Sequence, residues 1–172
     1  MWRMQLTARQ EFAAPPGRVY AMCIDPEFLA LAARDIGAFR HTVEVVPGGA
    51  GVLTRVSVET ETVPVLVPLA GRTLTLGQEM DWAGEGPDGA REARLVVKVA
   101  GFPVVMDARA RLAPTASGCA IDYAGDLRVA VPVLGGTIER QAAPYVLEVL
   151  GIQQRTGAAW LVALNEFPGR RI

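Results

Sequence analysis

Apolar and polar residues alternate strictly through a series of segments between residues 39 and 131. In the first of these, Phe39, His41, Val43 and Val45 alternate with Arg40, Thr42 and Glu44. Successive side chains of a β-strand point to opposite faces, so each segment gathers its apolar residues on one face. The pattern predicts an antiparallel sheet with one face in water and one apolar face that another element must cover.

Turn residues separate these segments. The first hairpin turn is expected at residues 47–49, and later turns at 84–89, 101–103 and 114–118. A further strand is predicted over Met4–Ala13. Pro64 and Pro68 predict that residues 63–71 cross between strands instead of pairing inside the sheet. About six to seven strands result.

Helical segments are expected at both ends of the alternating region. Two short helices should follow the first strand, separated by Asp25 and Pro26. A long helix is predicted from about Thr137 to about Leu164, because apolar residues there recur at spacings of three and four. We assign this apolar stripe to the sheet, and we expect Pro144 to kink the helix.

The long helix carries a second apolar stripe on its opposite side. Leu147, Leu150 and Leu161 lie on it. A helix that is apolar on two sides is usually covered on both. The N-terminal strand and the short helices could supply this cover, and our hypothesis is a homodimer contact through these three leucines.

Composition excludes several classes of protein. Hydrophobic residues make up 51% of the 172 residues, yet the longest uncharged runs have ten residues, against about 20 for a membrane span. The formal net charge is −1 without a basic cluster, so nucleic acid is not an expected partner. The first residues have no apolar stretch typical of a signal peptide, and we expect a cytoplasmic protein.

Metal and cofactor sites are not indicated. The chain has one histidine, and its two cysteines, Cys23 and Cys119, are far apart in the sequence. This is not a ligand set for zinc, and we expect both cysteines to be buried free thiols. No Gly-rich segment carries the residues of a phosphate-binding loop. We therefore predict no metal and no cofactor.

Four groups of residues resemble a known family. They are Gly71 with Leu74, Gln78 and Trp82; Gly101-Phe102-Pro103; Leu112-Ala113-Pro114 with Gly118; and Val131-Pro132-Val133-Leu134-Gly135-Gly136-Thr137-Ile138-Glu139, which is the most specific. With the predicted order of elements, they resemble the START-like (SRPBCC) superfamily, which includes pollen-allergen and polyketide-cyclase-like proteins. Within it, the chain is similar to a bacterial branch of uncharacterised function.

The resemblance implies one START-like domain over residues 1–172 with an α+β helix-grip fold. In this fold a curved antiparallel sheet has two short helices after strand one, and a long C-terminal helix packs on the sheet. The resemblance also implies a cavity between the sheet and the long helix. It carries over no catalytic residue.

Three polar residues are expected on the inner face of the sheet. His41, Gln78 and Tyr123 lie on the same face as their apolar neighbours, where their polar groups could orient a ligand or form hydrogen bonds within the core. The residues that we predict to bind a ligand are Phe39, His41, Val56, Val58, Gln78, Met80, Trp82, Leu95, Val97, Met106, Tyr123, Leu127, Tyr145, Val149 and Ile152.

The inner face is also rich in small residues. Ala93, Ala108, Ala110 and Gly125 lie there, and aromatic residues make up only 6% of the chain, which leaves space in the interior. We expect binding of a small hydrophobic ligand that is lipid-like, polyketide-like or another apolar metabolite. Two alternatives stay open. One is a cyclase/dehydratase- or hydrolase-type enzyme that uses His41 or Tyr123 as an acid or base, and the other is a protein-interaction module with a filled core.

Overall fold

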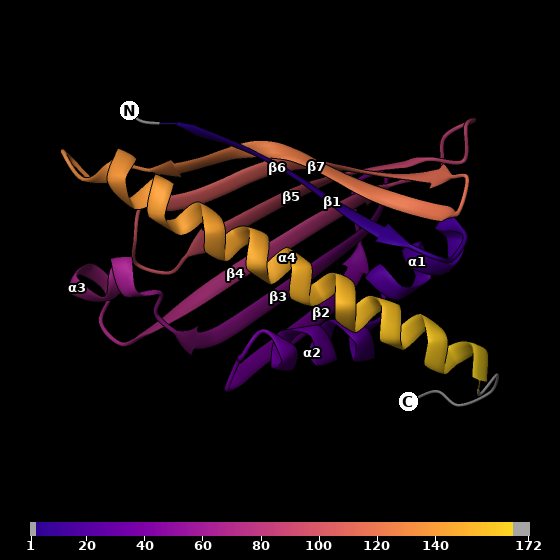
Figure 1. Cartoon of the computed structure of the whole chain (residues 1–172), viewed down its shortest axis with the longest axis horizontal. Helices are drawn as coiled ribbons and strands as arrows, with labels where there is room; N and C mark the ends of the chain where they lie inside the picture. Colours follow the sequence, from indigo (N-terminus) through magenta and orange to yellow (C-terminus); the bar gives the residue numbers. More distant parts are fainter. Residues whose placement is uncertain (1–2, 167–172) are drawn as a thin grey trace.

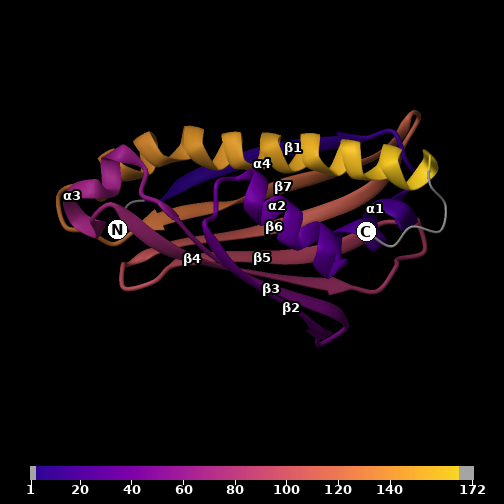
Figure 2. The ribbon, with the colours of Figure 1, turned by 90° about the horizontal axis from the view of Figure 1, so that it is seen from below.

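A curved antiparallel sheet forms one layer of the protein, and helices cover its inner face (Figure 1, Figure 2). The computed structural model describes residues 3–166. Its elements are β1 (Met4–Phe12), α1 (Pro16–Cys23), α2 (Pro26–Asp35), β2 (Arg40–Pro47), β3 (Gly51–Glu61), η1 (Pro64–Leu66), α3 (Val67–Ala70), β4 (Thr73–Ala83), β5 (Arg91–Val99), β6 (Val104–Thr115), β7 (Gly118–Val129) and α4 (Gly135–Glu166). The seven strands follow the order β1-β7-β6-β5-β4-β3-β2, which confirms the predicted α+β helix-grip fold.

The outer face of the sheet holds charged pairs across strands. Arg55 on β3 contacts Glu44 on β2 and Glu79 on β4, each at 3.1 Å. Arg94 on β5 binds Asp107 on β6 at 2.8 Å, and this hydrogen bond lowers the pKa of the Asp107 carboxyl. Exposed pairs of this kind contribute little to stability, but they keep this face in water and leave the other for the core.

The inner face is covered by α1, α2 and α4. Pro26 occupies the first turn of α2, and the Asp25 side chain caps this helix by accepting a hydrogen bond from the backbone N–H of Glu27 at 2.8 Å. The Thr156 hydroxyl of α4 donates to Asp35 at the end of α2, at 2.6 Å. The two helices are therefore linked as well as packed on the sheet.

Buried apolar residues form two separate clusters, one near each end of α4. The larger includes Trp82, Trp160 and Leu161, with Phe12 from β1 and Val19 from α1. The smaller joins Ile138 at the start of α4 to the ends of the central strands and to η1; its buried members are Leu66, Leu74, Val99, Val129 and Ile138. The helix is thus held at two places along its length.

The C-terminal half of α4 approaches its neighbours closely because residue 157 is a glycine. A Cβ atom there would lie 2.9 Å from the Phe12 ring and 3.0 Å from the Met22 methyl group. Any larger side chain at this position would push α4 away from β1 and α1. Gly157 therefore sets how deeply this end of the helix sits.

The run 131–139, the most specific part of the sequence resemblance, connects β7 to α4. Glu139 is only 3% exposed, and its Oε1 atom accepts a hydrogen bond from the backbone N–H of Val129 at 2.9 Å. Gly135 and Gly136 are buried at the helix start. The side chain of Glu139 therefore ties the second turn of α4 to the last residue of β7.

Helix α4 continues from Gly135 to Glu166 across Pro144, and neither view shows a sharp kink (Figure 1, Figure 2). The expected kink is therefore not seen. Pro144 is exposed, so the carbonyl group that loses its helical partner can bond to water. Among residues 3–166, no helix is long and apolar enough to cross a membrane.

The second apolar stripe of α4 is largely covered within the chain. Leu161 is 5% exposed and belongs to the larger core cluster, whereas Leu147 is 46% exposed. Leu150 is partly buried. Because β1 and α1 pack against α4, Leu161 cannot form part of a partner surface, and the hypothesis of a homodimer contact through all three leucines is wrong at this residue.

Replacing Glu139 tests its role as a tie between α4 and β7. We expect Glu139→Ala to lower the free energy of unfolding by about 2 kcal/mol, because a buried N–H loses its acceptor. Glu139→Gln keeps an acceptor oxygen and should lose less than half as much. Urea denaturation measures both, and equal losses in the two variants would contradict the role assigned to the hydrogen bond.

Candidate ligand-binding site

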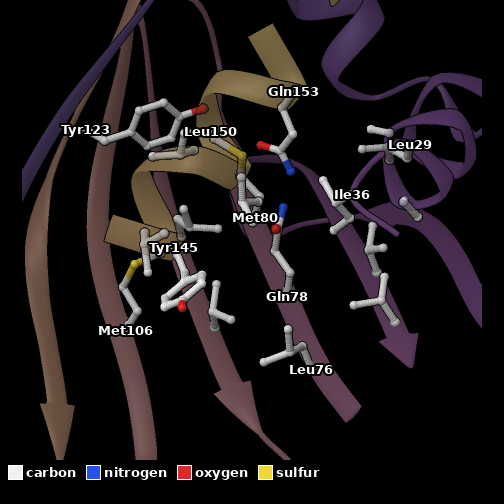
Figure 3. Close-up of a pocket in the computed structure, with 18 of the residues that line it drawn as sticks. Leu29, Ile36, Leu76, Gln78, Met80, Met106, Tyr123, Tyr145, Leu150 and Gln153 are labelled. Atoms are coloured by element: carbon white, nitrogen blue, oxygen red, sulfur yellow. The ribbon is translucent and has the colours of Figure 1, made fainter. Parts of the chain in front are cut away.

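A cavity of about 260 Å³ lies between the sheet and α4 (Figure 3). This volume equals that of roughly nine water molecules in the liquid. Side chains from β1, β3 to β7, α1, α2, η1 and α4 surround it, and one residue comes from the loop before η1. They are Gln10, Phe12, Met22, Cys23, Phe28, Leu29, Ala32, Ala33, Ile36, Thr54, Val56, Val58, Val63, Leu66, Leu74, Leu76, Gln78, Met80, Leu95, Val97, Val99, Val104, Met106, Tyr123, Leu127, Ala142, Tyr145, Val146, Val149, Leu150 and Gln153.

The strand register explains the floor of the cavity. Residues paired across the sheet share a face, and one such row crosses five strands: Val56, Gln78, Val97, Met106 and Leu127. All five line the cavity. The alternation of the sequence thus predicts that these residues share the inner face, because every second residue of a strand points to the same side. The strand register then brings them into one row.

Most of the residues predicted to bind a ligand meet in this cavity. Those that line it are Val56, Val58, Gln78, Met80, Leu95, Val97, Met106, Tyr123, Leu127, Tyr145 and Val149. Phe39, His41, Trp82 and Ile152 do not line it. That the lining residues contact a ligand stays a prediction.

Helix α2 separates the cavity from β2. His41 pairs with Val58 and shares its face, but α2 packs against β2, so this wall of the cavity is formed by Leu29 of the helix and by Ile36, the residue after its end. Phe39 precedes β2 and is 56% exposed. The sequence places both residues on the inner face but cannot show that a helix lies between them and the cavity.

Trp82 belongs to the filled part of the interior. It is fully buried, and its ring meets the Tyr20 ring edge to face at a centroid distance of 5.7 Å. In the sheet Trp82 pairs with Ala93, which pairs with Ala110. These alanines leave room for the large indole, so they belong to a packed core and not to a cavity wall.

Helix α4 presents Tyr145, Val149 and Gln153 to the cavity, together with Ala142, Val146 and Leu150. The sequence predicts that Ile152 follows Val149 on the inward-facing stripe, whereas in the structure Gln153 and not Ile152 lines the cavity. A search for apolar residues alone misses a glutamine, although the spacing of four residues from Val149 places Gln153 on the same side of the helix. The sequence places Leu150 on the opposite stripe, but Leu150 also lines the cavity, because the side of α4 that faces inward is wider than one stripe of side chains.

A chain of hydrogen bonds crosses one side of the cavity. The Tyr123 hydroxyl donates to Oε1 of Gln10 at 3.0 Å, and Nε2 of Gln10 donates to the backbone carbonyl of Leu150 at 2.8 Å. Gln10 was not singled out by the sequence, although it occupies an inner position of β1. The chain connects β7, β1 and the middle of α4, so it supports the helix beside the cavity.

Burial keeps two ionisable groups of the lining, the Cys23 thiol and the Tyr123 phenol, neutral at ordinary pH. Burial raises the pKa of the Cys23 thiol to about 12, with a smaller effect from Cys119. Burial likewise raises the pKa of the Tyr123 phenol, with a smaller effect from Cys23. Tyr123 is therefore a poor base at neutral pH, and His41 lies behind α2, so the geometry does not favour the acid or base roles considered for these two residues.

Comparison with known proteins gives the family. Residues 7–161 match a family described as "Protein of unknown function (DUF2505)". The chain belongs to this DUF2505 family. No curated protein matches it in sequence.

Solved structures share the helix-grip fold of the DUF2505 chain. Human STARD10 is 10% identical with a TM-score of 0.62, covering 94% of this chain and 66% of that one. A STAR-related lipid transfer protein from Xanthomonas axonopodis is 15% identical with a TM-score of 0.58, covering 92% and 85%. Ara h 8.0201 is 11% identical with a TM-score of 0.59, covering 94% and 99%. These similarities confirm the predicted START-like helix-grip fold.

Removing the Tyr123 hydroxyl tests the hydrogen-bond chain of the DUF2505 protein. We expect Tyr123→Phe to lower the free energy of unfolding by about 1 to 2 kcal/mol, because Gln10 loses a donor in a buried place. Tyr145→Phe is the matched control: Tyr145 also lines the cavity, and no hydrogen bond joins its hydroxyl to another residue within 3–166. This control should change the free energy by less than about 0.5 kcal/mol. A loss as large in the control would contradict the assignment.

Proposed function

We propose that the protein binds a small apolar molecule in the cavity between the sheet and α4. One observation carries this proposal: a space remains between the central strands and the helices that cover them, and mostly aliphatic side chains line it. Largely apolar cavities with a few polar groups are typical of small-molecule sites. Such a cavity also argues against the alternative of a filled core.

The energy of packing supports the same proposal. Side chains beside an empty space lack partner atoms and lose dispersion contacts. The side chains that line this space of about 260 Å³ therefore have packing energy to gain from an apolar partner. A bound apolar molecule would recover part of this energy, which gives binding a driving force without any charged contact.

The fold relatives agree with this interpretation. The Xanthomonas protein of the same fold is described as a STAR-related lipid transfer protein. We extend to this chain only the coarse feature of that description, an apolar cargo held inside a helix-grip domain. A lipid-like or polyketide-like cargo small enough for the cavity fits this proposal.

Filling the cavity tests the proposal. Val97 lies in the centre of the floor, and Val97→Phe should occupy the space that a ligand needs. We expect butylbenzene, a neutral hydrocarbon, to raise the melting temperature of the unmodified protein and to have no effect on this variant. Calorimetry measures both melting temperatures with and without the hydrocarbon.

The control is Val96→Phe. Val96 is the neighbouring residue on the same strand and, by alternation, points to the outer face, outside the cavity lining. This variant should keep the full response to butylbenzene. Equal responses of the two variants, or no response of the unmodified protein, would contradict binding in the cavity.

A further inference from the structure

Two carboxamide groups face each other across the cavity. Gln78 rises from β4 in the floor, and Gln153 descends from α4 on the opposite wall, with their side chains directed toward one another (Figure 3). Both residues are half-buried. Among residues 3–166, no hydrogen bond joins either side-chain carboxamide to another group.

This arrangement differs from the other glutamine of the cavity. Gln10 is buried as well, but its carboxamide both accepts from Tyr123 and donates to the Leu150 carbonyl. A polar group on an apolar wall without a partner costs free energy, so such groups call for an explanation. Gln78 lies between Val56 and Val97 in the floor row, where an aliphatic side chain would fit the pattern of its neighbours.

The lining has a second property that bears on the ligand. No Asp, Glu, Lys, Arg or His belongs to it within the described part of the chain. An ionised ligand group in the interior would therefore lose its water without gaining an opposite charge, which is strongly unfavourable. A carboxamide can donate and accept, so two of them can bind a neutral hydroxyl or carbonyl group from both sides.

From these observations we infer that Gln78 and Gln153 form a clamp for an uncharged ligand with one hydrogen-bonding group, an alcohol or a ketone and not a carboxylate or a phosphate ester. This inference rests on the proposed function, because it presupposes an apolar ligand in the same cavity. The volume of about 260 Å³ limits the buried part of the ligand to on the order of ten non-hydrogen atoms, if each atom with its hydrogens occupies about as much space as one water molecule in the liquid.

Three probes of similar size separate the possibilities in the unmodified protein. They are octan-1-ol, octanoate at pH 8 and butylbenzene, and isothermal titration calorimetry measures their affinities. We expect octan-1-ol to bind, and octanoate to bind at least about a hundredfold more weakly. Lowering the pH toward the ordinary carboxyl pKa of about 4 should strengthen binding of the acid by neutralising it. Octanoate binding as tightly as octan-1-ol at pH 8 would overturn the inference.

Variants of the clamp give the second test. Gln78→Leu and Gln153→Leu should each weaken octan-1-ol binding by about fivefold and leave butylbenzene binding unchanged or stronger, because only the alcohol uses the hydrogen bonds. Gln154→Leu is the matched control on the same helix, since Gln154 lies outside the cavity lining, and it should bind both probes normally. Both leucine variants should fold, since they replace an unpartnered polar group with an apolar one; Gln78→Met and Gln153→Met provide a second pair.

The outcomes distinguish this inference from the proposed function. If neither octan-1-ol nor butylbenzene binds the unmodified protein, the proposed function fails and the clamp fails with it. If both bind, and the leucine and methionine variants change the affinities for the two probes by the same factor, the cavity binds apolar molecules but the clamp is wrong. If these variants weaken the binding of octan-1-ol but not that of butylbenzene, the result supports the clamp.

Discussion

Helix α4 crosses the inner face of a curved sheet and is anchored near both of its ends, and the interior depends on this arrangement. With 32 residues it is about 48 Å long. The helix runs straight while the sheet curves away from it, and the cavity lies between the two anchored ends (Figure 2). Near one end, Ile138 packs in the smaller core cluster and Glu139 binds β7; near the other, Trp160 and Gly157 pack against β1, α1 and α2.

The inner face of the sheet is consequently divided into a filled part and an open part. Under α1 and the last turns of α4, large aromatic rings such as Trp82 lie over alanines, which gives the close packing expected of a protein interior. Toward the middle of α4, the floor carries mostly valine, leucine and methionine, and the cavity lies between them and the helix.

Polar groups of the interior show the same division of roles. Tyr123 donates a hydrogen bond to Gln10, and Gln10 donates one to the backbone of α4, which stabilises the helix where it spans the cavity. Within residues 3–166, Gln78 and Gln153 have no such protein partner, and they occupy opposite walls of the space that a ligand would enter. Ion pairs such as Arg55–Glu44 and Arg94–Asp107 lie on the outer face, and no charged residue of the described chain lines the cavity, which therefore suits a neutral apolar molecule.

The sheet, the order of the elements and the inner-face residues of the cavity floor can be predicted from the amino-acid sequence. These features follow from alternation, from prolines and glycines at turns, and from helical spacing, all of which are local properties of the chain. The tertiary structure was needed to show that α2 covers β2 beside His41, that Trp82 lies in a packed core, and that Gln153 and not Ile152 lines the cavity. Those outcomes depend on which element covers which part of a shared face. Periodicity does not contain this information, because it assigns a residue to a face without saying which element packs against it.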